Sequence, residues 1–151
     1  MMPEPHGGLG LGVTELGIIL EEMGRALVSG PYFATAALGA PAIVLGGNEA
    51  LKVRWLERIA GGEIKATVGI LDQDGQLGPE HVKTAEVKNN KGYVLNGKKF
   101  FVPDLAAADI AVIAARTGEG EDCVTLFLVE TGASGVSIEE NRLTDSTSRS
   151  G

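Results

Sequence analysis

The sequence has a single cysteine and no long apolar run. Cys123 has no second cysteine to pair with, so an intramolecular disulfide is excluded and a reducing, cytoplasmic location is the default expectation. No apolar stretch approaches the roughly 20 residues that a membrane-spanning helix needs, and the N-terminus has no basic region followed by an apolar core. These absences predict a soluble protein with no membrane partner.

The chain also has no excess of positive charge and no cluster of metal ligands. Its 13 Lys and Arg residues face 20 Asp and Glu residues, which gives a net charge of −7 and argues against a nucleic-acid partner. His6 and His81 are isolated from Cys and from acidic clusters, so no metal site is expected. The glycine-rich stretch 7–12 fits neither nucleotide-loop pattern and is interpreted as a structural loop.

What the sequence does contain is a helical half followed by a strand-rich half. Apolar residues recur at helical spacing over 14–28 and again after Asn48, a strong N-cap, up to Gly61-Gly62, with Trp55 on the core side. Between them, 32–45 is apolar throughout and predicts a buried helix that Pro41 limits or kinks. Three helices are therefore expected in the first 60 residues.

Beyond Lys65 the pattern changes to short runs rich in β-branched residues, and Asn89-Asn90-Lys91-Gly92 predicts a hairpin turn. The expected strands are 66–71, 82–88, 93–102, 110–115, 124–129 and 136–138. Those over 110–115 and 124–129 are apolar at almost every position, which predicts burial on both faces. The sequence predicts an α+β protein with a helical segment over 1–64 and an antiparallel β-barrel or sandwich domain over 65–151.

Three blocks of sequence resemble the flavin-dependent acyl-CoA dehydrogenases, in the order in which that family has them. Residues 7–12 and 21–27 resemble "YGGLGL" and "EELGRAL", and 49–63 resembles the helix that closes the family's N-terminal domain. Residues 92–116 resemble the signature "GY-x-L-NG-x-K-x-W-I-[TS]-N" of the central β-domain. The resemblance covers about residues 7–140.

The resemblance implies a helical N-terminal domain, a central β-barrel and a C-terminal four-helix bundle that supplies the catalytic Glu. Aligned on that plan, this chain corresponds to part of the helical domain and most of the β-domain, so it is expected to be inactive alone. By resemblance the reaction is the α,β-dehydrogenation of an acyl-CoA with FAD as cofactor, and an electron-transfer flavoprotein accepts the electrons. A homo- or hetero-oligomer is also implied.

The resemblance places the flavin beside two segments of this chain. The implied cofactor-binding residues are Ile70, Leu71, Asp72, Phe101, Val102 and Pro103. Leu71 replaces the family's Thr, Phe101 its Trp, and Pro103 a Thr or Ser. Phe101 can still stack on a ring, whereas Pro103 offers neither a hydroxyl nor a backbone N–H. These departures predict weaker FAD binding.

Lys98 and Lys99 are adjacent, so on a strand they would point to opposite faces: one could meet the phosphates of CoA, and at least one is expected to be a solvated edge charge.

Three functions remain open. The first is a part of an acyl-CoA dehydrogenase. The second is a non-catalytic partner subunit that has lost flavin ligands. The third is a truncated reading frame without a function of its own.

Overall fold

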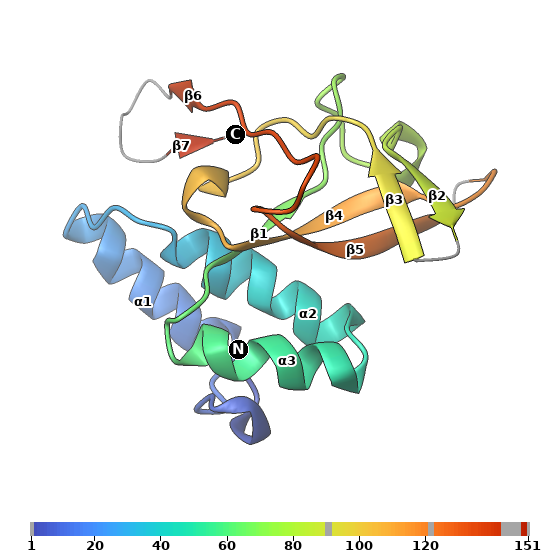
Figure 1. Ribbon diagram of the computed structural model, residues 1–151. Coiled ribbons are helices and arrows are strands. Elements are labelled where there is room, and N and C mark those ends of the chain that lie inside the picture. Colours follow the sequence, from blue (N-terminus) through green and yellow to red (C-terminus); the bar gives the residue numbers. More distant parts are fainter. Residues whose placement is uncertain (1, 90–91, 121–122, 143–148, 151) are drawn as a thin grey trace.

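The computed structural model describes residues 2–89, 92–120, 123–142 and 149–150. Figure 1 shows two layers, with the helices α1, α2 and α3 on one side and the strands β1 to β5 on the other. The helical segment therefore precedes a sheet domain in the chain and packs against it, and the α+β prediction is confirmed.

The helices form close to where the sequence predicts them. They are α1 (Val13–Arg25), α2 (Ala40–Gly46) and α3 (Glu49–Ala60), with a π-helical segment η2 (Ala34–Gly39) and the 3-10 turns η1 (Glu4–His6), η3 (Pro79–His81) and η4 (Leu105–Ala107). Helix α1 ends three residues earlier than expected because Leu27 adopts a left-handed backbone with φ 51°.

Pro41 does not break the second helix, because the chain changes its helical pitch before it. The π-helical turn η2 leads directly into α2, and Pro41 lies in the first turn of α2. A proline has no N–H to donate and its ring clashes with the carbonyl four residues earlier. The wider π turn is a common way of accommodating such a conflict inside a helix.

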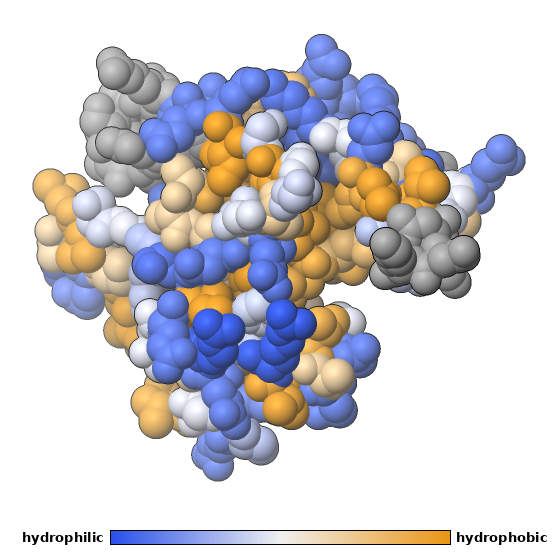
Figure 2. Space-filling model, viewed as in Figure 1, coloured by the Kyte–Doolittle hydropathy of each residue, from blue (hydrophilic) through white to orange (hydrophobic). Residues whose placement is uncertain are grey.

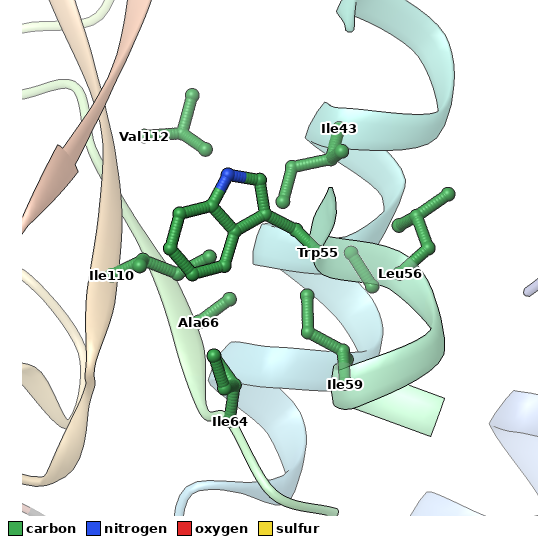
Figure 3. Close-up of a cluster of buried hydrophobic side chains, with 9 residues drawn as sticks. Ile43, Trp55, Leu56, Ile59, Ile64, Ala66, Ile110 and Val112 are labelled. Carbon is green, nitrogen blue, oxygen red and sulfur yellow. The ribbon is translucent and has the colours of Figure 1, made fainter. Parts of the chain in front are cut away.

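The helical and sheet layers share one apolar core, with Trp55 of α3 at its centre (Figure 3). The Asn48 side chain accepts a 2.9 Å hydrogen bond from the backbone N–H of Leu51, which caps α3 as predicted. Trp55 is 4% exposed and packs among Ile43 of α2 and Ile110 and Val112 of β4. The predicted core position of Trp55 is confirmed.

The sheet is mixed, whereas an antiparallel barrel or sandwich was expected. Its strands are β1 (Ala66–Gly69), β2 (Ala85–Asn89), β3 (Gly92–Asn96), β4 (Ile110–Arg116) and β5 (Val124–Glu130). Strands β2 and β3 form the predicted hairpin, and β4 pairs antiparallel with β5, but β1 runs parallel to β4. A short connection allows β2 and β3 to pair antiparallel, whereas β1 and β4 are joined by a long crossover that permits parallel pairing.

Within the described residues the sheet does not close into a barrel. Strand β4 is central, with β1 and β5 on its two sides and β2 meeting it only at Ala85 and Arg116. A separate pair joins β6 (Asn141–Arg142) to β7 (Arg149–Ser150).

Three strand predictions need correction. Strand β3 stops at Asn96 and does not continue to Val102, because its partner β2 begins at Ala85, opposite Asn96, and the Phe100 N–H bonds to Leu71 instead. No strand forms over 136–138. Strand β4 is buried as predicted, but β5 is half exposed, with Leu126 48% exposed, because the described part of the chain leaves its outer edge uncovered.

The connection between the two layers is short. Helix α3 ends at Ala60 and β1 begins at Ala66, so the predicted division between residues 64 and 65 falls in the connecting segment, and it stays a prediction. None of the helices in the described ranges is long and apolar enough to cross a membrane.

Candidate functional site

Two segments that are about 30 residues apart in sequence lie side by side where β1 ends. The backbone N–H of Phe100 donates a 2.9 Å hydrogen bond to the carbonyl oxygen of Leu71. The Lys99 ammonium donates a 3.1 Å bond to the carbonyl oxygen of Ile70. The residues after β1 and the residues after β3 are therefore fixed against each other.

Together these segments carry an apolar wall, which we define as Ile70, Leu71, Phe101, Val102 and Pro103. Ile70 is 42% exposed and Phe101 is 58% exposed, whereas Val102 is 1% exposed and anchors the segment. The Pro103 carbonyl accepts a 2.6 Å hydrogen bond from the Thr67 hydroxyl of β1. The wall thus presents an aromatic and an aliphatic side chain outward from a fixed support.

The backbone of Phe101 is held in an uncommon conformation. Its φ is 52°, in the left-handed region that residues with a Cβ rarely adopt, and Asp104 has φ 49°. Such a conformation costs about 1–2 kcal/mol per residue, so the surrounding bonds must hold it in place. Non-glycine residues in this region are concentrated at functional sites.

Beneath the wall lies a buried ion pair between Asp72 and Lys99. The side chains are 4% and 7% exposed, and the carboxylate oxygen is 3.1 Å from the ammonium nitrogen. The Asp72 carboxylate also accepts bonds from the backbone N–H groups of Lys83 (2.6 Å) and Thr84 (3.1 Å) and from the Thr84 hydroxyl (2.7 Å). Four donors therefore converge on one buried carboxylate.

These contacts fix the charge states of the pair. Burial raises the pKa of Asp72, but the hydrogen bonds from Thr84, Lys83 and Lys99 outweigh burial and hold the pKa below 3.8. Burial lowers the pKa of Lys99, and the bond to Asp72 opposes that shift. Asp72 is therefore an ionised, internally paired carboxylate near neutral pH.

Two glycines allow the segments to approach so closely. A Cβ on Gly97 would lie 2.5 Å from the Thr84 hydroxyl oxygen and 2.7 Å from the Thr84 Cα. A Cβ on Gly69 would lie 2.9 Å from Ile113 Cδ1 and 3.3 Å from Lys99 Cγ. The glycine at position 97 of the signature motif is thus required by the backbone of Thr84.

The structure brings the six predicted cofactor residues together but gives them different roles. Ile70, Leu71, Phe101, Val102 and Pro103 form the wall, whereas Asp72 points inward, and only its backbone lies near the wall. Their contact with a cofactor stays a prediction. The sequence alone did not identify the supporting residues Thr84 and Gly97, although Gly97 and Lys99 both stand in the signature motif.

The two adjacent lysines differ as expected for neighbouring positions. Lys98 is exposed and its ammonium is 2.8 Å from a carboxylate oxygen of Glu139, a contact that lowers the pKa of Glu139. Lys99 is buried against Asp72. A solvated surface charge is confirmed for Lys98, and Lys99 is enclosed.

An exposed polar cluster lies on the loop that follows the wall. Asp74 accepts a 3.0 Å bond from the Lys83 ammonium and lies 3.2 Å from Nδ1 of His81. The bonds from Lys83 and His81 lower the pKa of Asp74 to about 2. No group of three or more His, Cys, Asp or Glu side chains that could hold a metal ion is found among the described residues.

Comparison with known proteins identifies the same two parts of the chain. Residues 1–63 match "Acyl-CoA dehydrogenase, N-terminal domain", and residues 70–150 match "Acyl-CoA dehydrogenase, middle domain". The cyclohex-1-ene-1-carbonyl-CoA dehydrogenase of Geobacter metallireducens is 33% identical in an alignment that covers 93% of this chain. The mitochondrial isovaleryl-CoA dehydrogenase of Pongo abelii is 30% identical in an alignment that covers 91% of this chain.

A solved structure is similar over almost the whole chain. The acyl-CoA dehydrogenase of Bacillus anthracis, crystallised in complex with FAD, superposes with a TM-score of 0.79 at 33% identity and covers 93% of this chain. The present chain corresponds to 25% of that structure's chain, and to 38% and 34% of the Geobacter and Pongo proteins. Because the middle-domain match alone spans more than half of the residues, the chain belongs to the acyl-CoA dehydrogenase family.

Proposed function

We propose that this chain is the helical and β-domain part of an FAD-dependent acyl-CoA dehydrogenase. The reaction of the whole enzyme is the α,β-dehydrogenation of an acyl-CoA thioester, with an electron-transfer flavoprotein as the electron acceptor. Family membership supports the proposal, and so does the FAD bound to the Bacillus anthracis relative. The observation that carries it is the exposed Phe101 ring, in a segment that the Phe100 N–H ties to Leu71 just after β1.

The residues present fit one face of a flavin by apolar contact. A flat aromatic ring that is 58% exposed, next to an exposed aliphatic side chain, is suited to stack against the isoalloxazine. Bound FAD would supply the acceptor for the hydride that leaves the substrate's β-carbon. The wall would orient the ring system and exclude water from one of its faces.

Hydrogen bonding to the flavin is the weaker half of the fit. Leu71 has no hydroxyl, and Pro103 has neither a hydroxyl nor a backbone N–H. The Pro103 carbonyl is itself occupied by Thr67. We therefore propose that this chain binds FAD mainly by stacking, and that its affinity is lower than if both positions carried Thr.

Removal of the substrate's α-proton needs a carboxylate that can accept it. Asp72, the carboxylate next to the wall, is buried and already accepts bonds from Lys83, Thr84 and Lys99. A buried carboxylate that already accepts four hydrogen bonds and has a lowered pKa is a poor general base. We propose that the 151-residue polypeptide does not turn over acyl-CoA by itself.

Flavin retention tests the proposal directly. The purified chain is incubated with FAD, desalted and examined for flavin absorbance, and Phe101→Ser is compared with Phe33→Ser, which changes another half-exposed aromatic, at the start of η2. Phe101→Ser should weaken FAD binding roughly tenfold, and Phe33→Ser should leave it unchanged. Equal binding by all three proteins would contradict a stacking role for Phe101. Turnover of any acyl-CoA by the isolated chain would contradict the proposed inactivity.

A non-catalytic partner subunit of a hetero-oligomeric dehydrogenase is the second candidate, and the two lost hydroxyl positions favour it. Large apolar side chains are exposed on the helical layer, among them Leu27 at 84% and Leu45 at 87%. Figure 2 shows such apolar surface where α1 ends. Co-purification of a second dehydrogenase-like chain would support this candidate, and a flavin-loaded homo-oligomer would exclude it. A cytosolic location stays a prediction in both cases.

A further inference from the structure

The buried pair of Asp72 and Lys99 has no obvious value as a stabilising element. Removing two charges from water costs several kcal/mol per ion, and replacing a buried pair by apolar side chains is often neutral or stabilising. The buried cluster around Trp55, by contrast, consists of apolar side chains, and the Arg54 and Arg58 guanidinium groups lie over the indole ring. A pair with side chains only 4% and 7% exposed therefore calls for another explanation.

The contacts of the pair connect three separate segments. Asp72 follows β1, and its carboxylate holds the backbone N–H groups of Lys83 and Thr84, at the start of β2. Lys99 comes from the segment after β3 and bonds to Asp72 and to the Ile70 carbonyl at 3.1 Å each. The Lys99 ammonium thus bonds both to the Asp72 carboxylate and to the backbone carbonyl of Ile70, a residue of the wall.

The position of Lys99 in the chain couples it to Phe101. Lys99 precedes by one residue the Phe100 N–H that bonds to Leu71, and by two residues the left-handed Phe101. A strained backbone persists only where its surroundings over-determine it. The Lys99 side chain and the Phe100 N–H are two independent attachments of this segment to the end of β1.

From this geometry we infer that Asp72 and Lys99 are positioning residues, which hold Ile70 and Phe101 in the arrangement that a flavin ring requires. The inference rests on the proposed function, because the object being positioned is the flavin-binding wall. It assigns a role to the Lys of the signature motif that is distinct from a contact with the CoA phosphates. It also explains why Asp72 lies in the site without facing a ligand.

The test separates position from stability with three variants. Lys99→Met leaves the Asp72 carboxylate buried without its cation. Asp72→Asn combined with Lys99→Met removes both charges and keeps the approximate shapes. Lys98→Met is the control, because the exposed Lys98 ammonium lies over the Phe100 ring at 5.3 Å and pairs with Glu139, while the bonds to Asp72 and Ile70 come from Lys99. For each protein, the readouts are the denaturant midpoint, the amide hydrogen exchange rate of Phe100 by NMR, and the FAD dissociation constant.

We expect Lys99→Met to lower the denaturant midpoint, because a buried unpaired charge remains. In the double variant the midpoint should recover most of that loss. Exchange at Phe100 should nevertheless stay about tenfold faster than in the wild type, and the FAD dissociation constant about tenfold higher, because the bond to Ile70 is still missing. Lys98→Met should match the wild type in all three readouts.

Recovery of all three readouts in the double variant would overturn the inference, since the pair would then be purely structural. Unchanged Phe100 exchange in both Lys99 variants would overturn it as well. If Lys99→Met does not fold, the double variant alone decides between these outcomes. Failure of the wild-type chain to bind FAD would count against the proposed function, while the exchange rate of Phe100 would still decide whether Lys99 holds the wall.

Discussion

The core around Trp55 and the wall around Phe101 are built on opposite principles. Trp55 is 4% exposed among aliphatic side chains from α2, α3, β1 and β4 (Figure 3), and the guanidinium groups of Arg54 and Arg58 lie 4.6 and 5.6 Å from its ring centroid. Phe101 is 58% exposed, its backbone is strained, and its support is a buried ion pair with a set of hydrogen bonds. The Trp55 ring is held by the side chains that bury it, whereas the Phe101 ring is held through its backbone and stays exposed.

This contrast indicates which residues stabilise the fold and which orient side chains for binding. Apolar burial is not directional, so it stabilises the fold without dictating the orientation of any group to within a few degrees. Hydrogen bonds and ion pairs are directional and contribute little net stability, but they can dictate such an orientation. Changes in the core should therefore alter the free energy of unfolding, and changes in the wall should alter binding.

The largest expected effect is the loss of the Trp55 side chain. Trp55→Ala should lower the free energy of unfolding by about 3–5 kcal/mol, because it leaves a cavity between the helices and the sheet. The control is Val53→Ala on the exposed side of α3, where the change should stay within about 0.5 kcal/mol. Urea titration measures both. A loss below about 1 kcal/mol for Trp55→Ala would mean that the two layers do not share a cooperative core.

Trp55→Phe tests how much the buried indole N–H of Trp55 affects stability. The indole Nε1 is buried and has no hydrogen-bond partner among the described atoms, so the N–H is desolvated without compensation. Phenylalanine removes this group together with part of the ring. The loss should therefore be clearly smaller than for Trp55→Ala. An equal loss would show that the indole N–H is satisfied in solution.

An intermediate effect on stability is expected from adding a Cβ at Gly97. Gly97→Ala places a Cβ 2.5–2.7 Å from the hydroxyl oxygen and Cα of Thr84, and backbone must move, so about 1–3 kcal/mol of stability should be lost. Gly17→Ala in α1 meets nothing within 4 Å and should gain up to about 1 kcal/mol from helix propensity. Opposite signs in the denaturant midpoints are the expected result. A neutral Gly97→Ala would argue against the close approach of β2 and the signature segment.

The sequence predicts the core better than the wall, and particular residues show why. Asn48, Trp55 and the apolar spacing of α3 are local signals, each readable within one or two helical turns. The wall depends on pairs that no local pattern encodes. Asp72 and Lys99 are 27 residues apart, and Lys99 reads as a surface charge until its buried partner is known.

The sheet shows the same division. The β2–β3 hairpin follows from its turn residues, but the parallel pairing of β1 with β4 joins residues 44 apart in sequence, such as Ala66 and Ile110. The predicted strand over 93–102 is too long because apolar residues resume at Phe100 and give the stretch the composition of a strand. Only tertiary contacts reveal that Gly97 crosses Thr84 and that Phe101 turns left-handed.

A smaller effect, with the opposite sign from the core, is expected at Phe101. Phe101→Gly relieves a left-handed backbone worth about 1–2 kcal/mol, while glycine costs about 0.5–1 kcal/mol in unfolded-state entropy. The exposed ring contributes little burial, so stability should rise by up to about 1 kcal/mol while FAD binding weakens. Leu27→Gly is the matched control, since Leu27 has φ 51° just after the end of α1, in the helical layer.

Leu27→Gly should raise the denaturant midpoint by a similar amount and leave FAD binding unchanged. A fall of more than about 1 kcal/mol for Phe101→Gly would place Phe101 among the core-like residues and remove the contrast with Trp55.

The smallest effect is expected from the exposed charges beside the wall, and it depends on pH. The pKa of Asp74 is lowered to about 2 from 3.8, so its contribution to stability is fully present above the unfolded-state value and disappears as the pH falls through about 2. Asp74→Asn should therefore be less stable than the wild type near neutral pH, and the two urea midpoints should converge between pH 4 and pH 2. The difference near neutral pH should also shrink at high salt, because Asp74 and Lys83 are screened at the surface. A difference between the two urea midpoints that stays constant from pH 4 to pH 2 would mean that Asp74 stabilises the loop by packing and not by its charge. The loop beside the wall would then be stabilised by packing, as the core is, despite its hydrogen bonds.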